Sequence, residues 1–210
     1  MHQVVRDVTA RLESRSAACR ARFLRSLEMQ RAAGRGRDSL PCSNLAHAAA
    51  AMQGVARENL ITGGGRHLGI VSAFNEMVSA HYPYHDYPEQ IRKALEGSGV
   101  SAQIAGMVPA MCDGITQGTT GMDMSLFSRD VVAQSVAVAL SHNVFDAVLI
   151  LGICDKIAPG LLMGAAAFSP LPVEKPSTAT APSASQQRVK GLSLFIMNQL
   201  RKPSGTPPWL

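Results

Sequence analysis

A short uncharged run, Ala147–Leu151, constrains the fold of this chain more than any other stretch. It is apolar throughout and partly β-branched. A run of this length and composition is typical of a strand buried on both faces, as in a parallel sheet covered by helices. The sequence therefore predicts an α/β fold.

Strand-like and helix-like segments alternate along the rest of the chain. Strands are predicted over residues 68–74, 100–104 and 147–153, and helices over residues 87–94 and 129–142. This alternation predicts a mostly parallel sheet flanked by helices. Pro159 and Gly160 are expected to stop regular structure after the last strand.

A thiol, a carboxylate and an amine follow the buried run directly, as Cys154, Asp155 and Lys156. Open α/β sheets place their ligands at the carboxyl ends of their strands, so these three side chains fall where a site is expected. The alternative is a free buried cysteine beside a surface ion pair, which is the commoner meaning of an arbitrary Cys-Asp-Lys string.

A second Cys-Asp pair, Cys112 and Asp113, favours the functional reading. Glycines at positions 114, 118 and 121 follow it and allow the close approach of a ligand. Thiolates prefer iron or zinc and carboxylates prefer magnesium or manganese, so the two pairs could serve a soft and a hard metal together. Neither loop has the Cys-x-x-Cys spacing of a zinc site.

Composition limits the classes of protein that remain. The 210 residues are 46% hydrophobic, no segment has the uncharged length of a membrane span, and the first residues do not read as a secretion signal. Four unevenly spaced cysteines argue against a disulfide framework and predict a cytoplasmic location. The arginine-rich start is interleaved with acids and lacks an aromatic platform, so nucleic-acid binding is not expected.

Three parts are predicted along the chain. Residues 1–36 form a charged helical arm, residues 37–172 an α/β domain, and residues 173–210 a tail of different composition. Six of the 12 prolines lie in the last 40 residues, together with five of the 20 Lys and Arg and a single acid, Glu174. Residues 175–187 are rich in Ser, Thr, Ala and Pro, which is typical of a segment that does not fold.

Five motifs in order carry a resemblance to a known family. They are residues 42–47 (CSNLAH), 79–81 (SAH), 109–114 (PAMCDG), 125–130 (SLFSRD) and 152–156 (GICDK). In sequence and spacing they resemble the amino-terminal part of the dihydroxy-acid and 6-phosphogluconate dehydratases, on the phosphogluconate side of that family. The resemblance runs from about Val4 to Pro172.

The resemblance implies a reaction of the Entner-Doudoroff pathway. Water would be removed from the small-molecule substrate 6-phosphogluconate to give 2-dehydro-3-deoxy-6-phosphogluconate. A proton leaves the carbon next to the carboxylate and hydroxide leaves the next carbon. The enzyme therefore needs a base, a Lewis acid for the hydroxyl and positive charge near the forming enolate.

The resemblance also implies roles for individual residues. Cys154 matches a thiolate ligand of a 4Fe-4S iron-sulfur cluster, and Cys112 matches a further ligand used by some relatives. Asp113 and Asp155 match carboxylates that hold a divalent metal, Mg²⁺ or Mn²⁺, and Lys156 matches a lysine that is carbamylated to join them. For Cys42, ligation and a small buried side chain are equally good interpretations; no role is expected for Cys19.

Substrate contacts are predicted from weaker signals. His47, His81 and His85 are candidates for a carboxylate or phosphate, with His81 preferred because it lies in a family motif. Arg129 is a further candidate, although a solvated arginine at a helix start is the alternative, with Ser128 as the cap.

Two residues near His81 depart from the family pattern. Glu76 stands where Asp is usual and Tyr82 where Gln is usual. These changes affect expected substrate contacts and leave the metal motifs intact.

The tail does not continue the family pattern, so a frameshift or truncation near codon 172 is expected, with the α/β domain incomplete. Two hypotheses follow. One is an active hydro-lyase, homodimeric as in the full-length family. The other is an inactive fragment that binds a phosphosugar acid or metal weakly or pairs with other subunits. A cluster with part of its ligands should be labile or absent.

Overall fold

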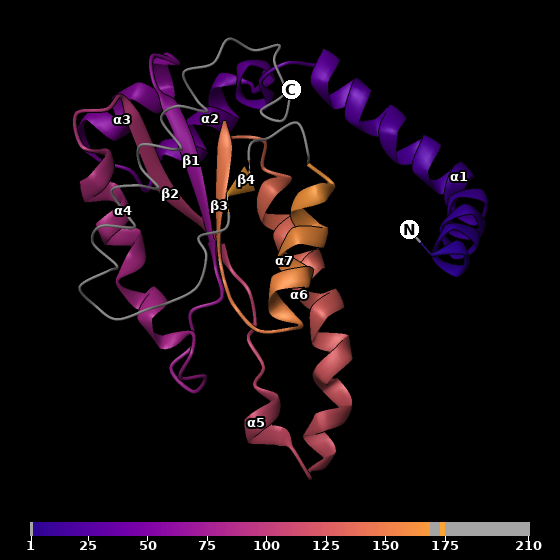
Figure 1. Cartoon of the computed structure of the whole chain (residues 1–210). Helices are drawn as coiled ribbons and strands as arrows, with labels where there is room; N and C mark the ends of the chain where they lie inside the picture. The colour runs from indigo at the N-terminus through magenta and orange to yellow at the C-terminus, as the bar shows by residue number, and fades with distance from the viewer. Residues whose placement is uncertain (1, 169–172, 175–210) are drawn as a thin grey trace. The chain divides into compact units, whose positions relative to one another are not determined.

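The computed structural model describes residues 2–168 and the backbone of residues 173–174. The described residues fall into two compact units, divided between Gly34 and Arg35. The tail segments singled out in the sequence, including residues 175–187, lie outside the described residues. Figure 1 shows the elements of both units.

The first unit is a single long helix, α1 (Gln3–Ala32). The side chain of His2 accepts a hydrogen bond from the amide of Val4 at its start, and Gly34, with a φ of 74°, follows its end. The helix has no buried residue. The helix predicted over the first residues is therefore present, and its apolar positions, such as Val5, are exposed within this unit.

The second unit is built on a parallel sheet. Its strand order is β2-β1-β3-β4, with β1 (Arg66–Ser72) paired to both β2 (Val100–Met107) and β3 (Ala147–Leu151), and β4 (Val173–Glu174) paired to β3. The α/β fold with a mostly parallel sheet is thus confirmed. All five residues of β3 are buried, as the apolar run predicts.

Helices cover both faces of this sheet (Figure 1). One face carries α4 (Tyr87–Leu95), which contacts β2, and the other carries the packed pair α6 (Ser125–Leu140) and α7 (Ile157–Ala166). The remaining helices are α2 (Cys42–Ala49), α3 (Gly54–Thr62) and the short α5 (Asp113–Thr116), with 3-10 turns η1 (Gly36–Ser39), η2 (Tyr82–His85) and η3 (Thr120–Met124).

Among the described residues, two hydrophobic clusters lie on opposite faces of the sheet, and a third, smaller cluster lies between α2 and α3. Alternate residues of β3 point to opposite sides, so Leu149 joins the cluster under α4 while Ile150 joins the cluster under α6 and α7. Both residues are fully buried. This two-sided burial is the reason that the strand is a continuous apolar run rather than an alternating one.

Two predictions about helix ends are wrong. Pro159 and Gly160 do not stop regular structure, because they lie in the first two turns of α7, where proline is tolerated. Ser128 is not a helix cap, because α6 begins at Ser125; the Ser128 hydroxyl instead donates to the Ser125 carbonyl at 2.6 Å.

Glycines set the distance between α6 and α7. A Cβ added to Gly160 would lie 2.7 Å from the carbonyl oxygen of Arg129, and one added to Gly164 would lie 2.4 Å from that of Ala133. Both distances are shorter than real contacts. The two helices therefore pack backbone against backbone, which fixes the start of α7 against the sheet.

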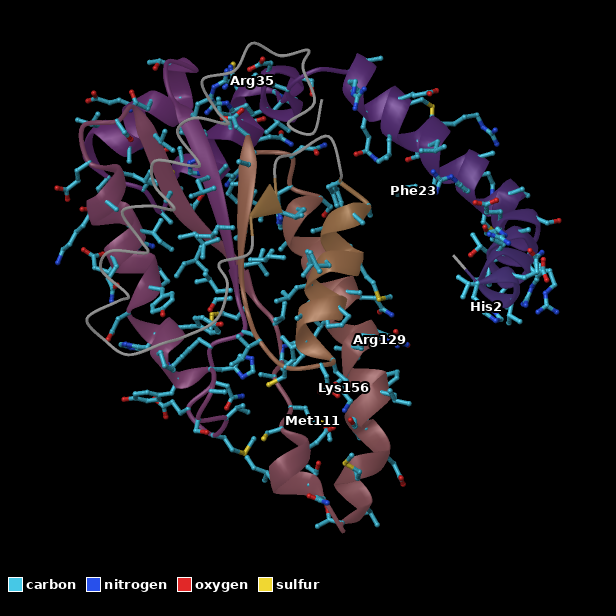
Figure 2. The ribbon with its side chains drawn as sticks, in the orientation of Figure 1. His2, Phe23, Arg35, Met111, Arg129 and Lys156 are labelled. Carbon is cyan, nitrogen blue, oxygen red and sulfur yellow. The ribbon has the colours of Figure 1, made fainter. Side chains whose placement is uncertain are left out.

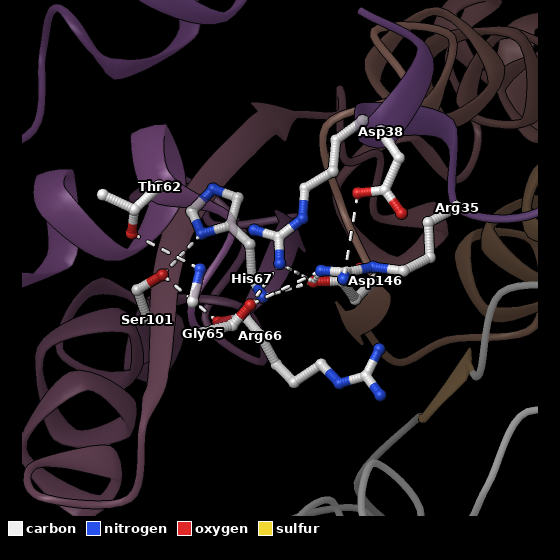
Figure 3. A network of polar contacts seen from close by, with 10 residues as sticks. Arg35, Asp38, Thr62, Gly65, Arg66, His67, Ser101 and Asp146 are labelled. Carbon is white, nitrogen blue, oxygen red and sulfur yellow. Dashed lines mark hydrogen bonds and ion pairs between the residues drawn. The ribbon is translucent and has the colours of Figure 1, made fainter.

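A charged network closes the edge of the sheet at which the strands begin, called here the amino edge (Figure 3). Asp146, the residue before β3, accepts hydrogen bonds from the amide of His67 and Nε of Arg35, each at 2.8 Å. Nη2 of Arg37 lies 3.2 Å from the same carboxylate. The side chains of Arg37 and Asp146 are each only 3% exposed.

His67 extends this network along the edge. Its ring is fully buried, with Nδ1 2.8 Å from Oγ of Ser101 and Nε2 3.1 Å from Oε1 of Gln103. The ring also stacks on Phe145 with centroids 5.2 Å apart. Burial lowers the pKa of His67, because the charged ring would lose hydration.

Candidate functional site

The predicted metal and thiol residues lie at the opposite edge, where β1, β2 and β3 end, called here the carboxyl edge. Ser72, the last residue of β1, is in register with both Met107 and Leu151. The three strands therefore end at one level, and the loops that follow them meet there. Figure 2 shows Met111 and Lys156 on two of these loops.

Lys156 joins two carboxylates from different loops. Its Nζ donates to Oδ2 of Asp155 at 2.7 Å and also to Oδ2 of Asp113. Asp113 follows β2 and is the first residue of α5, whereas Lys156 immediately precedes α7. The fold thus brings the two Cys-Asp loops together, although β1 lies between the strands that they follow.

Ser125 belongs to the same group, although the sequence does not predict it. Its buried hydroxyl, at the first residue of α6, donates to Oδ1 of Asp113 at 2.7 Å. The one sequence signal for this role is that Ser125 lies in the SLFSRD motif. Because the helix is predicted to begin only at residue 129, that signal does not identify Ser125 as a site residue.

The ionisation of the group follows from these contacts. The hydrogen bond from Lys156, and then that from Ser125, lower the pKa of Asp113. The hydrogen bonds to Asp113 and then to Asp155 raise the pKa of Lys156. At neutral pH Lys156 is therefore an ammonium and Asp113 a carboxylate.

Two thiols flank this charged group. Cys154 has a φ of 78°, the left-handed conformation that residues with a Cβ rarely adopt. Burial, followed by the neighbouring Cys112, Asp155 and Asp113, raises the pKa of the Cys154 thiol. The four cysteines of the chain are all free, and Cys112 and Cys154 lie close enough to interact electrostatically.

Tyr84 is a second neighbour of Cys154 that the sequence did not reveal. It lies in η2 and is nearly buried. Burial raises the pKa of Tyr84 to about 12, with smaller contributions from Tyr87 and Cys154. The Tyr84 ring itself packs against His81 and Tyr87, with centroids 5.8 Å and 5.3 Å apart.

The four candidates for substrate contact lie in different parts of the second unit. His81 lies at the carboxyl edge, fully buried, with Nε2 3.3 Å from both the amide and the carbonyl of Ile153. Arg129 lies on α6 with its Nε 3.3 Å from Asp130 (Figure 2). His47 is exposed on α2, and His85 is exposed and 2.7 Å from Asp86.

The remaining cysteines lie elsewhere. Cys42 is the exposed first residue of α2, so the interpretation as a small buried side chain does not hold. Cys19 is exposed on α1.

The donor set can be compared with what a metal needs. Within residues 2–168, no group of three or more His, Cys, Asp or Glu side chains is arranged to hold a metal ion. Two carboxylates do converge on one positive centre, which here is the ammonium of Lys156. That charge pattern fits a divalent cation, whereas two thiols are fewer than the ligands that a 4Fe-4S cluster ordinarily takes.

The fold and the site together define a class. This is a parallel α/β domain with a carboxylate, amine and thiol group at the carboxyl edge of its sheet. The sequence matches the family described as dihydroxy-acid/6-phosphogluconate dehydratase, N-terminal, over residues 66–181. The chain belongs to this family. The match extends beyond Pro172, the residue at which the motifs predict that the resemblance ends.

The relatives are phosphogluconate dehydratases. The chain is 51% identical to that of Pseudomonas aeruginosa over 172 residues, 45% to that of Zymomonas mobilis over 196 residues and 44% to that of Escherichia coli K12 over 189 residues. These matches cover 82%, 91% and 88% of this chain but 28%, 32% and 31% of the relatives. The chain therefore spans about a third of their length.

None of the helices that the structure describes is both long and apolar enough to cross a bilayer.

Proposed function

We propose that this chain serves a hydro-lyase reaction, the dehydration of 6-phospho-D-gluconate to 2-dehydro-3-deoxy-6-phospho-D-gluconate in the Entner-Doudoroff pathway. The observation that carries the proposal is the group formed by Asp113, Lys156 and Asp155 beside two thiols at the carboxyl edge. The names of the relatives support the choice of substrate.

The chain's own residues suit part of this chemistry. Elimination next to a carboxylate builds negative charge on the substrate, and a preorganised cation stabilises such charge. Lys156 is that cation, because its two carboxylate partners keep it protonated. Asp113 stays ionised, so it can accept a hydrogen bond or bind a metal, but it cannot act as a proton donor.

A divalent cation, Mg²⁺ or Mn²⁺, would be held by Asp113 and Asp155. Carbamylation would change Lys156 from a cation into a third anionic ligand, so a divalent metal in place of the ammonium would leave the net charge of the group unchanged. In that state the metal, rather than Lys156, would supply the positive charge. Bound there, the metal would supply a Lewis acid for a substrate oxygen. Ser125 would keep Asp113 oriented in either state.

An iron-sulfur cluster, as the motifs imply, would take Cys154 and Cys112 as ligands. It would supply an open iron that binds the leaving hydroxyl. The described residues provide these two thiols only as a pair, so further ligands would have to come from outside the described part of the chain.

A second candidate function follows from that incomplete donor set. The chain would bind a divalent cation or a phosphosugar acid without turnover, or pair with other subunits. The absence of a three-residue metal group among residues 2–168 favours this candidate for the polypeptide alone. We also propose homodimerisation, which the resemblance to the full-length family implies. A cytoplasmic location is proposed as well, since thiol-ligated clusters suit a reducing compartment.

Anaerobic reconstitution separates the two candidates. The full chain is treated with iron and sulfide, desalted, and measured for cluster absorption, bound iron and formation of a 2-oxo acid from 6-phosphogluconate. The hydro-lyase proposal expects all three, and expects Cys154→Ser to remove them. Cys19→Ser, an exposed cysteine on α1, is the matched control and should change none.

Other outcomes decide against the first candidate. Retained iron without 2-oxo acid, or no iron at all, would contradict an active hydro-lyase. Binding of Mn²⁺ that persists in the same protein and is lost in Asp113→Asn would then establish the binding function.

A further inference from the structure

The Cys154 turn, residues Ile153 to Lys156, adopts a conformation that its own sequence does not favour. Among the described residues, only Asn143 and Cys154 have a positive φ without being glycine. Asparagine tolerates the left-handed region, whereas cysteine gains nothing there. Contacts outside the turn must therefore hold it.

The carbonyl of Cys154 accepts from the amide of Ala158 at 3.1 Å, which ties the turn forward to α7. The contact on its other side comes from a distant loop. Nε2 of His81 lies 3.3 Å from both backbone polar atoms of Ile153, the residue before the thiol. His81 and Ile153 are 72 positions apart in sequence.

His81 is itself held rigidly. Its ring is fully buried and packs against Tyr84 with centroids 5.8 Å apart, and its amide donates to the carbonyl of Val78 at 2.8 Å. Nδ1 is buried without a hydrogen-bond partner. Because the ring is buried and only Nε2 has hydrogen-bonding partners, both of them backbone atoms, His81 is placed to hold that backbone. It has no exposed surface with which to contact a substrate.

We propose that His81 is a positioning residue: it holds Ile153 through Nε2 and thereby keeps Cys154 in its left-handed turn at the carboxyl edge. The contact is a property of the chain alone. Its meaning for catalysis rests on the proposed function, but the test below does not need turnover or a bound cluster.

Two amide substitutions distinguish this role from a general packing role. The terminal atoms of glutamine reach the position of Nε2, whereas those of asparagine reach only the position of Nδ1. His81→Gln should therefore keep the contact with Ile153, and His81→Asn should lose it. Both replacements are polar and smaller than the imidazole ring, so packing loss alone predicts a greater effect from asparagine on stability, not a selective effect on one thiol.

The readout is the alkylation rate of each cysteine, measured anaerobically by mass spectrometry in the full chain. Without the contact to His81, the Cys154 backbone should leave its left-handed conformation, which would move the thiol and make it more accessible to the reagent. The Cys154 rate relative to the Cys112 rate should rise about tenfold in His81→Asn, the equivalent of about one hydrogen bond. The ratio should stay near wild type in His81→Gln.

Three results would overturn the proposal. They are an unchanged ratio in His81→Asn, an equal rise in both variants, and a rise shared by Cys112 and the exposed control Cys42. The last would indicate general loosening.

If His81→Asn does not fold, the unsubstituted chain provides the second test. ¹⁵N-histidine NMR should show a hydrogen bond at Nε2 of His81 and none at Nδ1, with Nε2 either donating to the Ile153 carbonyl or accepting from the Ile153 amide. An Nε2 resonance without hydrogen bonding would refute the contact.

Discussion

The two edges of the sheet use charged residues in opposite ways. At the amino edge, Asp146 and Arg37 are almost completely buried and connect the strands to the segment before them. At the carboxyl edge, the side chain of Asp155 is 76% exposed and that of Asp113 is 32% exposed, although both contact Lys156. The centre of the first network, Asp146 and Arg37, is enclosed by protein, whereas both carboxylates of the second are accessible to a ligand.

This difference separates structural charge from functional charge. A buried ion pair loses hydration on both partners, so its loss leaves a stranded charge. An exposed pair is screened by water and contributes little to stability. Its charges remain available, however, to bind something else.

The largest effect is expected from Asp146→Ala. It would leave the buried guanidinium of Arg37 without its carboxylate, at a cost of about 3–5 kcal/mol in the free energy of unfolding. Urea unfolding followed by circular dichroism measures this cost. The matched control is Asp38→Ala, which removes an exposed carboxylate 3.8 Å from Arg35 and should cost about 0.5 kcal/mol or less. Similar losses in both variants would break the comparison of the edges.

A pH dependence is expected from His67 at the same edge. Burial lowers the pKa of His67 from 6.5, so the unfolded chain binds a proton more readily than the folded one. Stability from the neutral ring is complete above about pH 6.5 and decreases as the pH falls towards the folded pKa, by at most about 1.4 kcal/mol per pH unit.

Unfolding free energies measured from pH 7.5 downward should show this slope. His67→Phe should reduce it, and His81, whose pKa burial also lowers, should account for part of the remainder. A slope that is unchanged in His67→Phe would show that the amino edge does not sense protons through this ring.

At the carboxyl edge, Lys156→Met should change ionisation more than stability. The pKa of Asp113 should rise towards its ordinary value, because the hydrogen bond from Lys156 is the largest cause of its lowering. Carbon-13 NMR titration of the carboxyl groups measures this shift. The unfolding midpoint should change far less than in Asp146→Ala, and an equal loss would mean that both edges are structural.

The smallest effect is expected from Ser125→Ala. Its hydroxyl is the second cause of the lowered pKa of Asp113, so the same titration should move upward, but less than in Lys156→Met. The opposite order would show that Ser125 rather than Lys156 controls the carboxylate. Ser128→Ala is the control, since its hydroxyl bonds only the helix backbone.

The sequence predicts the parts of this molecule that depend on local pattern. The apolar run at Ala147–Leu151 identifies the central strand, and the residues after it fall at the carboxyl edge as expected. The prediction for Pro159 is wrong because proline usually ends regular structure, whereas here it lies in the first turn of α7, where it is tolerated. The local pattern does not show where that helix begins.

Contacts between distant residues could not be predicted from local pattern. Arg35 and Asp146 are 111 positions apart, and neither lies in a motif that suggests the other. The same holds for His81 and Ile153. The family motifs identify Cys112, Asp113 and Lys156 as important, but the hydrogen bond from Ser125 and the proximity of Tyr84 depend on how the helices start.

The start of α7 has a fixed register as a result of the packing of α7 against α6. A residue inserted between Ile157 and Gly160 would turn the rest of the helix by about 100° about its axis. Gly160 and Gly164 would then leave the backbone of α6, and side chains would take their place at distances of under 3 Å. Substitutions in residues 153–156 can therefore alter the chemistry of the site one side chain at a time, whereas a single insertion or deletion in the first turn of α7 would disrupt the core beneath the site.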